Sequence, residues 1–316
     1  MLARRFGAPL RVCLPLLALV LLAPAGWAQT DAPTDTGGGT AASASDRLTG
    51  TLGKIHDSGA VTIGYRTASF PFSYMLGGRP VGYSIDLCLG IVGAIEKAVD
   101  REVRVDYVPV TSDSRIPDVR AGKIDLECGS TTSNAERQKQ VSFSPIMFIA
   151  GTKLMVKRAS GIRSYRDLAG KTVVFTAGTT NEAVMRKLDE RNHLGIKFVS
   201  APDHDASFAM VADGKADAFA TDDVLLSGLI ATHHASDQLM VVGDFLSYEP
   251  YAIMFRRDDP AFAEVVEHAF ESMAEDRDLL ETYHRWFQRP TISGERLNLP
   301  MSAELSDIFR LLGVQD

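Results

Sequence analysis

The chain of 316 residues has only three cysteines, fewer basic than acidic residues, and a single long apolar run. No cysteine pair has histidines nearby in the spacing of a zinc site. A cysteine nucleophile would need a general base, which no motif supplies. The sequence therefore predicts no metal, no cofactor and no cysteine-based catalysis.

Basic side chains are too few for a nucleic-acid-binding surface. The chain has 33 Lys and Arg against 40 Asp and Glu, a formal net charge of −7. Such a balance argues against nucleic acid as a partner. It also means that an acidic ligand would need a local cluster of positive side chains to attract it.

The apolar run covers residues 12–24 and follows three arginines, Arg4, Arg5 and Arg11. It is too short to cross a membrane comfortably, which takes about 20 residues. Gly26 and Ala28 supply the small residues that signal peptidases read. We therefore expect residues 1–28 to be a cleaved signal peptide and the protein to reach the periplasm. Cleavage would leave 30 basic and 40 acidic side chains, a net charge of −10.

Two segments of the exported chain follow from this reading. Residues 29–46 are rich in Gly, Ala, Ser and Thr, a composition that cannot form a core, so we expect a flexible leader. The signal peptide would remove Cys13 and leave Cys88 and Cys128 in an oxidising compartment. The sequence therefore predicts a disulfide between Cys88 and Cys128.

The remaining chain alternates short β-type runs with amphipathic helical segments. The predicted strands are residues 61–65, 103–108, 124–126, 172–175, 196–200 and 218–220. This alternation is typical of an α/β fold with mostly parallel sheets, and the length favours two lobes. Residues 121–125 and 213–217 repeat an x-Gly-Lys-x-Asp pattern before a strand, which indicates that the lobes are related.

Residues 127–145 carry the most informative motif. A strand is followed by Ser130, Thr131 and Thr132, and then by a helical segment that contains Arg137. Hydroxyls and backbone N–H groups at a helix N-terminus, with a guanidinium nearby, suit a carboxylate. A capping loop with Arg137 as a surface charge is the alternative.

The run Gly-Ser-Thr-Thr-Ser-Asn-Ala-Glu-Arg-Gln at 129–138 resembles the signature of periplasmic glutamate/aspartate-binding proteins of ABC importers, among the family 3 bacterial extracellular solute-binding proteins. Matching pieces recur in order at 64–66, 71–74, 81–84, 111–117, 177–180 and 203–204. The resemblance implies a type II periplasmic-binding-protein fold with a ligand cleft between the lobes. Lobe 1 would comprise residues 47–149 and 254–316, and lobe 2 residues 150–253.

The resemblance also implies ligand-binding roles. The ligand α-carboxylate would meet Ser130, Thr132, Arg137 and Thr179, with Thr176 in the same loop as Thr179. Asp222 or Asp223 would face the α-ammonium. The side-chain carboxylate pocket would comprise Arg66, Ser112, Arg115 and His204, whose positive charges would neutralise a buried dicarboxylate.

Alternatives stay open for these pocket residues. Arg66 and Arg115 would instead be surface residues, Ser112 a helix cap, and His204 part of a charged helix start. Tyr65 and Phe72 would pack either on the ligand's methylenes or in the core. Residues 246–250 depart from the family pattern. They precede residues 252–256, the second predicted crossover between the lobes, and would approach the rim of the cleft.

The implied function is capture of an acidic amino acid by hinge closure and delivery to an ABC permease, by a monomer without catalytic activity. A second function on the same fold is a periplasmic arogenate or prephenate dehydratase. That enzyme needs an acid/base group, and the arginine-rich pocket offers no obvious isolated carboxylic acid. A sensor domain would require a transmembrane helix or an output module, which the sequence does not contain.

Overall fold

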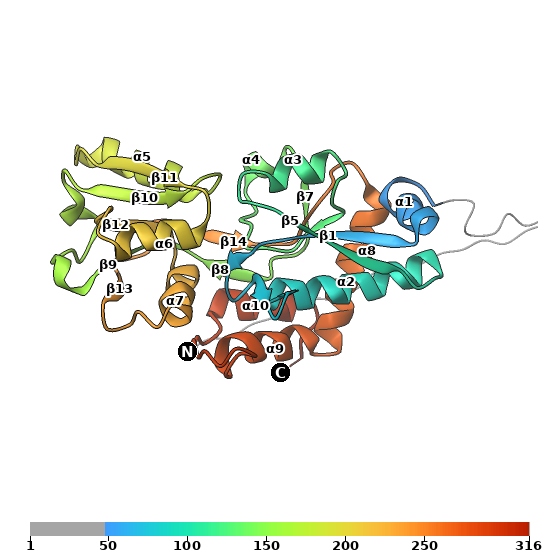
Figure 1. Cartoon of the computed structure of the whole chain (residues 1–316). Helices are drawn as coiled ribbons and strands as arrows, with labels where there is room; N and C mark the ends of the chain where they lie inside the picture. Colours follow the sequence, from blue (N-terminus) through green and yellow to red (C-terminus); the bar gives the residue numbers. More distant parts are fainter. Residues whose placement is uncertain (1–47, 316) are drawn as a thin grey trace, which may run out of the picture. The chain divides into compact units, whose positions relative to one another are not determined.

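The computed structural model describes residues 48–315, which form an α/β fold. The predicted signal peptide and leader lie outside these residues. Two five-stranded sheets dominate the architecture (Figure 1). All six predicted strands are present, with ends that differ from the prediction by at most two residues. The predicted α/β class is therefore confirmed.

The first sheet has the strand order β5-β1-β6-β15-β7. Its strands are β1 (Ala60–Tyr65), β5 (Arg104–Pro109), β6 (Leu126–Glu127), β7 (Ser142–Phe143) and β15 (Met254–Phe255). β1 pairs in parallel with β5 and β6, whereas β15 runs antiparallel to both of its neighbours. Four of the five strands therefore share a direction, and the late strand β15 is inserted between earlier ones.

The second sheet repeats this plan in the order β11-β10-β12-β9-β13. Its strands are β9 (Thr152–Lys157), β10 (Thr172–Thr176), β11 (Lys197–Ala201), β12 (Ala218–Asp222) and β13 (Leu239–Val242). β10 pairs in parallel with β11 and β12, and β9 is the antiparallel strand. Both sheets thus bring the carboxyl ends of their parallel strands to one edge, where ligand sites usually form.

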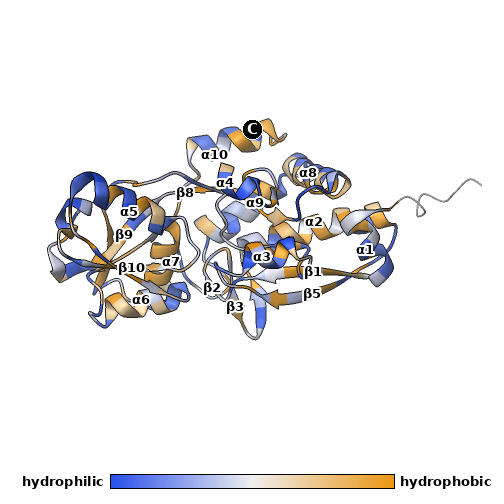
Figure 2. Ribbon diagram, turned by 90° about the horizontal axis from the view of Figure 1, so that it is seen from above, coloured by the Kyte–Doolittle hydropathy of each residue, from blue (hydrophilic) through white to orange (hydrophobic). Residues whose placement is uncertain are grey.

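Helices cover both faces of each sheet because the strands are apolar on both sides. On the first sheet, α1 (Gly50–Ser58), α2 (Tyr83–Val99) and α8 (Pro260–Glu275) share one core, and α3 (Arg115–Arg120) packs on the other face. On the second sheet, α5 covers one face and α6 and α7 cover the other. In Figure 2, the strands of the second sheet are mostly hydrophobic and the outer turns of α5 are hydrophilic. These helices are α5 (Asn181–Asn192), α6 (His204–Ala212) and α7 (Asp223–Thr232).

Two short strands, β8 (Phe148–Ala150) and β14 (Glu249–Tyr251), pair with each other where the chain passes between the sheets. The predicted lobe boundaries, at residues 149/150 and 253/254, fall at or just after these strands and stay a prediction. A separate three-stranded sheet follows β1 and comprises β2 (Ala68–Ser69), β3 (Ser73–Leu76) and β4 (Arg79–Val81).

The C-terminal helices pack on the core of the first sheet. α9 (Asp278–Tyr283) continues as a short π-helix (His284–Gln288), and α10 (Ala303–Leu311) follows. Trp286 and Phe287 are buried in this core. The remaining helices are α4 (Ala135–Gln138) and two 3₁₀ turns at Arg158–Ser160 and Tyr165–Leu168.

The predicted internal repeat has a structural basis. Gly122 and Gly214 follow α3 and α6 with positive φ of 67° and 76°, which favours glycine after a helix. The aspartate three residues later accepts a hydrogen bond from a strand N–H in each case, Asp125 from Thr62 at 2.9 Å and Asp217 from Thr172 at 2.8 Å. In each sheet, the aspartate after this glycine turn is therefore hydrogen-bonded to the central parallel strand.

The disulfide between Cys88 and Cys128 is present, with the two Cα atoms 6.3 Å apart. It joins α2 to the segment directly after β6, as predicted. The bridge closes a loop of 40 residues, for which chain-entropy estimates give about 4 kcal/mol of stabilisation. It thereby anchors the start of the hydroxyl loop at residues 129–133.

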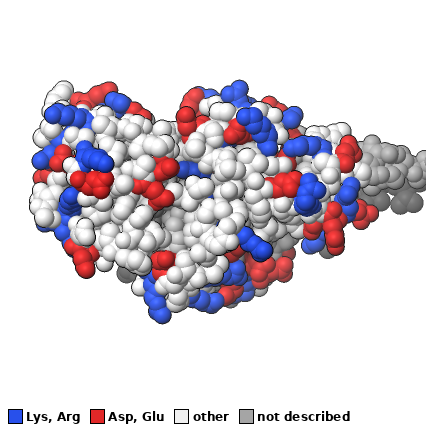
Figure 3. Space-filling view, in the orientation of Figure 1, with Lys and Arg blue, Asp and Glu red and all other residues white. Residues whose placement is uncertain are grey.

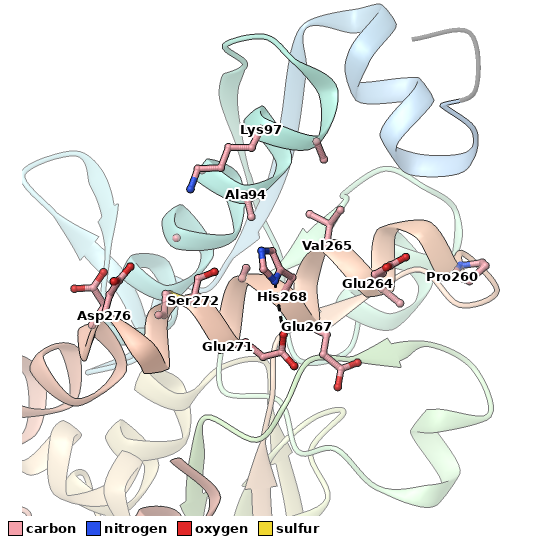
Figure 4. A pocket seen from close by; sticks show the side chains of 17 residues that line it. Ala94, Lys97, Pro260, Glu264, Val265, Glu267, His268, Glu271, Ser272 and Asp276 are labelled. Carbon is pink, nitrogen blue, oxygen red and sulfur yellow. Dashed lines mark ion pairs between the residues drawn. The ribbon is translucent and has the colours of Figure 1, made fainter. Parts of the chain in front are cut away.

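Among residues 48–315, no helix is long and apolar enough to cross a membrane. In Figure 3, acidic and basic side chains are mixed towards the margins of the face that is drawn, and the middle of that face is mostly uncharged. A groove of about 1060 Å³ runs between α2 and α8. Figure 4 shows Ala94 and Lys97 on one side and the His268–Glu271 ion pair, at 3.6 Å, on the other. The groove is lined mainly by small and acidic residues, and no buried donor without a partner lies among them.

Candidate functional site

A second, nearly closed cavity of about 10 Å³ lies at the carboxyl edges of the two sheets. This space is no larger than one water molecule needs, so an amino acid would fit only after the strand-end loops move apart. Its lining comes from strand-end loops of both sheets and is almost entirely polar. The lining residues are Ser112, Arg115, Ser130, Thr132, Arg137, Thr179, Thr180, Asn181, His204, Thr221, Asp222 and Leu225. Eight of the eleven predicted ligand-binding residues are among them.

The hydroxyl loop follows β6 and is buried. The Ser130 Oγ has no hydrogen-bond partner in the protein, while the Thr132 Oγ1 donates to Glu249 at 2.7 Å. Asn134 caps α4 by accepting from the Arg137 N–H at 2.9 Å. The alternative of a capping loop is therefore wrong for residues 130–132. The prediction that these hydroxyls lie at a helix N-terminus is also wrong, because α4 begins only at Ala135.

Arg137 is buried against carbonyl oxygens of both sheets' loops. Its Nη1 donates to the Thr132 carbonyl at 3.0 Å, and its Nη2 donates to the Gly178 carbonyl at 3.2 Å. Burial, reinforced by the charge of Arg115, lowers the pKa of Arg137 to about 10, so the guanidinium stays charged at neutral pH. The alternative of a surface charge is wrong, since the residue is 8% exposed.

Arg115 begins α3 and is 2% exposed. Its Nη1 donates to the Thr131 Oγ1 at 2.7 Å, whereas its buried Nε has no partner. The Ser112 Oγ, which also lines the cavity, is buried and unpartnered. Ser112 therefore does not cap α3, and a surface position for Arg115 is excluded.

Arg66 follows β1 and is 2% exposed, although it does not line the cavity directly. Its buried Nη1 lacks a hydrogen-bond partner. Burial and the neighbouring charge of Arg115 lower the pKa of Arg66 to about 9, which still leaves it charged at neutral pH. Two arginines therefore lie close together in a buried environment, as predicted, and not at the surface.

His204 is the first residue of α6 and is 2% exposed. Its Nδ1 lies 2.8 Å from the Thr176 Oγ1, which places Thr176 behind the histidine and outside the cavity lining. Burial, followed by the charges of Arg66 and Arg115, lowers the pKa of His204 well below its usual value. The expectation that His204 contributes positive charge is therefore wrong, because the imidazole is neutral and serves as a hydrogen-bonding group.

Asp222 and Asp223 differ in position. Asp222 ends β12, lines the cavity and accepts hydrogen bonds from the Tyr251 hydroxyl and from the Asn181 Nδ2, the latter at 2.8 Å. Burial and the neighbouring Glu249 raise the pKa of Asp222 to about 7. Asp223 does not line the cavity and accepts from the Gly151 N–H at 3.2 Å. Burial raises the pKa of Asp223 as well. Of the two aspartates that the resemblance implied for the α-ammonium, Asp222 lines the cavity and Asp223 does not.

Sequence reasoning missed two buried carboxylates beside the cavity. Glu249 accepts from Thr132 at 2.7 Å, from Thr180 at 2.8 Å and from Ser247 at 2.6 Å. It therefore links a loop of the first sheet to a loop of the second. Its only sequence signal was its place in the divergent segment 246–250, which does approach the cavity.

The other missed carboxylate is Glu127, the last residue of β6, which is completely buried. Its Oε2 accepts from the Thr131 Oγ1 at 2.5 Å, and its Oε1 has no partner. A glutamate at the end of an apolar strand was the available signal. The cavity residues Thr180, Asn181, Thr221 and Leu225 were also missed, and Thr180 directly follows the predicted Thr179.

Phe72 and Tyr65 lie away from the cavity lining. Phe72 is fully buried and its ring contacts those of Tyr83, Phe148, Tyr251 and Phe287, with centroids 5.0–6.0 Å apart. Tyr65 meets Tyr107 edge to face. Core packing is therefore the role of Phe72. Over residues 48–315, no group of three or more His, Cys, Asp or Glu side chains could hold a metal ion.

The cavity lining thus combines buried donors with a carboxylate. Arg115, Arg137 and the hydroxyls of Ser112 and Ser130 supply donors, and Asp222 supplies an acceptor. Such a site suits a small zwitterion that carries an additional negative charge.

Comparison with known proteins gives a consistent match. Residues 61–289 match the bacterial extracellular solute-binding proteins, family 3. The chain is 45% identical over 269 residues to the L-glutamate/L-aspartate-binding protein of Pseudomonas aeruginosa, covering 84% of this chain and 89% of that one. It is 37% identical over 301 residues to the glutamate/aspartate import solute-binding protein of Escherichia coli, covering 94% and 95%. A solved mutant of ArgBP from T. maritima superposes with a TM-score of 0.68 at 28% identity, covering 75% of this chain and 99% of that one.

Proposed function

Because the chain belongs to the bacterial extracellular solute-binding proteins of family 3, we propose that it captures L-glutamate or L-aspartate. The ligand would occupy the cavity between the strand-end loops and be delivered to an ABC permease. The relatives described above are solute-binding proteins, so the chain is a binding protein and not an enzyme. We further propose that it is exported to the periplasm through its signal peptide and acts there as a monomer.

One observation carries the ligand assignment. Four side-chain donors beside the cavity are buried without any partner in the protein. They are the Arg66 Nη1, the Arg115 Nε, the Ser112 Oγ and the Ser130 Oγ. A buried donor that lacks a partner costs about 1–3 kcal/mol, and more when it is charged. A ligand with two carboxylates supplies the acceptors that these groups need.

The proposed orientation is the one that the family resemblance implies. The α-carboxylate meets Arg137, with Ser130, Thr132 and Thr179 around it. The side-chain carboxylate meets Arg115 and Arg66, with Ser112 and His204 around it. His204 contributes a hydrogen bond and no charge, and Thr176 fixes its ring by contacting the Nδ1.

Asp222 is the residue that we propose for the α-ammonium. It lines the cavity, whereas the Asp223 carboxylate accepts from a backbone N–H outside it. Asn181 and Tyr251 hold the Asp222 carboxylate by donating to its two oxygens. Asp223 then stabilises the start of α7 and the adjoining turn.

Binding would hold the two sheets' loops together. Arg137 and Glu249 already contact loops of both sheets, and the chain crosses between the sheets at β8 and β14. A ligand bound between those loops adds contacts only in the closed arrangement and so favours it.

Calorimetric titration of the purified chain with all common amino acids tests the proposal. We expect submicromolar to micromolar binding of L-glutamate and L-aspartate, and at least tenfold weaker binding of their amides. Absence of heat with both acids would contradict it, as would turnover of prephenate or arogenate by the same preparation.

A further inference from the structure

Glu127 lies behind the arginine pair of the proposed side-chain pocket. Its side chain is completely buried, and its Oε2 accepts from the Thr131 hydroxyl, which in turn accepts from the Arg115 Nη1 at 2.7 Å. One bridging hydroxyl therefore connects the carboxylate to the guanidinium. The Thr131 hydroxyl donates its proton to Glu127 and accepts one from Arg115.

Glu127 also approaches Arg66. A Cβ atom placed on Gly129 would lie 2.4 Å from the Glu127 Oε1 and 2.8 Å from the Arg66 Cγ. Both side chains therefore pass the same glycine, which leaves no room for a larger residue. The charge of Glu127 raises the pKa of Arg66 and of Arg115, opposing the effect of burial.

The charges around this pocket can be counted by position. Arg66 and Arg115 carry two positive charges, and His204 is neutral. Glu127 carries one negative charge, and it is not among the residues that line the cavity. Arg137 and Asp222 are assigned to the α-carboxylate and the α-ammonium, and Glu249 accepts hydrogen bonds from Thr132 and Thr180. Asp203, the N-cap of α6, also raises the pKa of Arg66, by less than Glu127 does.

We propose that Glu127 determines specificity by cancelling one of the two arginine charges, so that the pocket accepts a side chain with a single negative charge and rejects a dianion. The inference rests on the proposed function and adds the charge class of the ligand's side chain. A net charge of about +1 is neutralised by one carboxylate. A second negative charge would be buried without compensation, at high cost.

Two ligands of the same shape separate charge from size. O-sulfo-L-serine carries one negative charge on its side chain, and O-phospho-L-serine carries nearly two at pH 8, since the second phosphate pKa is about 6. Calorimetric or competition titration of the unmodified chain at pH 8 should show at least tenfold tighter binding of the sulfate. Equal binding, or a preference for the phosphate, would overturn the proposal even if no variant folds.

Glu127→Gln keeps the size and removes the charge. In this variant the sulfate-to-phosphate affinity ratio should fall at least tenfold, whereas Glu127→Asp should keep the preference for the sulfate. Glu271→Gln, which removes an exposed carboxylate on α8, should leave the ratio and the glutamate affinity unchanged. An unchanged ratio in a folded Glu127→Gln protein that still binds glutamate would overturn this inference alone. Failure of the unmodified chain to bind glutamate, aspartate and both serine esters would overturn the proposed function with it.

Discussion

At the scale of single residues, the two cavity-lining arginines make different contacts and are expected to have different roles. Arg115 lies beside Ser112 and Thr131, whereas Arg137 reaches the Gly178 carbonyl across the cavity. Removing one partner of a buried ion pair costs about 3–5 kcal/mol. Arg115→Ala and Arg137→Ala should therefore each weaken glutamate binding by a factor of hundreds or more.

The comparison with glutamine distinguishes the two roles. Glutamine keeps the α-carboxylate and lacks the second charge, so Arg137→Ala should remain severe while Arg115→Ala should have little effect. Isothermal titration of both variants with both ligands measures this. Equal losses for both ligands in both variants would refute the assignment of the two arginines.

Asp222 makes binding depend on pH. Its pKa is raised to about 7, chiefly by burial and then by Glu249, whereas an unperturbed Asp titrates near 3.9. The folded state then holds a proton that the unfolded state has lost, so the unliganded protein loses stability as the pH rises from about 4 to about 7. Denaturant unfolding at several pH values should show this decline, and Asp222→Asn should reduce it.

Ligand binding requires Asp222 to be ionised, whereas the unliganded protein is more stable when Asp222 is protonated. An α-ammonium needs the ionised carboxylate, so amino-acid affinity should fall by up to about tenfold per unit below pH 7, with a proton released on binding. Calorimetry at pH 6 in buffers of different ionisation enthalpy measures that proton. A binding heat independent of the buffer would show that Asp222 is already ionised in the free protein.

At the scale of elements, Glu249 in β14 connects strand-end loops of both sheets. Its carboxylate accepts three hydrogen bonds, from Thr132, Thr180 and Ser247. Hydrogen bonds to a charged group contribute about 1.5–3 kcal/mol. Glu249→Gln should therefore weaken glutamate and aspartate by a similar factor, about tenfold to a hundredfold.

Two quantities test this role of Glu249: the loss of affinity for each ligand in Glu249→Gln, and how that loss compares between ligands. Titrations with glutamate, aspartate and glutamine should show parallel losses, because the residue contacts protein loops and not the side-chain pocket. A loss of affinity confined to one ligand would show that Glu249 contacts that ligand directly and does not hold the loops together.

The order of the elements could be predicted from the sequence because strands and helices here have distinct periodicities. Residues 61–65 and 172–175 are apolar runs buried on both faces, and α2 keeps a helical spacing of apolar residues from Cys88 to Val99. The antiparallel insertion of β15 between β6 and β7 could not be predicted in this way. It depends on pairing between segments more than 100 residues apart.

The site was predicted in part, for a physical reason. Motifs reveal residues that meet a ligand, and eight of the predicted residues line the cavity. They do not reveal residues that act through others, such as Glu127 behind Arg115 or Glu249 beneath Thr132 and Thr180. The neutral state of His204 was also out of reach, since it follows from burial next to two arginines.

At the scale of the whole molecule, ligand binding should be coupled to closure and stability. A ligand that binds only the native state raises the melting temperature, by an amount that grows with its concentration relative to Kd. Saturating L-glutamate should therefore raise Tm and reduce the radius of gyration in solution scattering. An unchanged Tm at millimolar glutamate and aspartate would remove acidic amino acids from consideration.

The most direct test of the central claim is a crystal structure of the protein with L-glutamate. We predict that the side-chain carboxylate lies within about 3.2 Å of donors on Arg66 or Arg115, with the α-carboxylate on Arg137 and the α-ammonium on Asp222. Glutamate bound in the reverse orientation, or outside the cavity between the strand-end loops, would contradict the account.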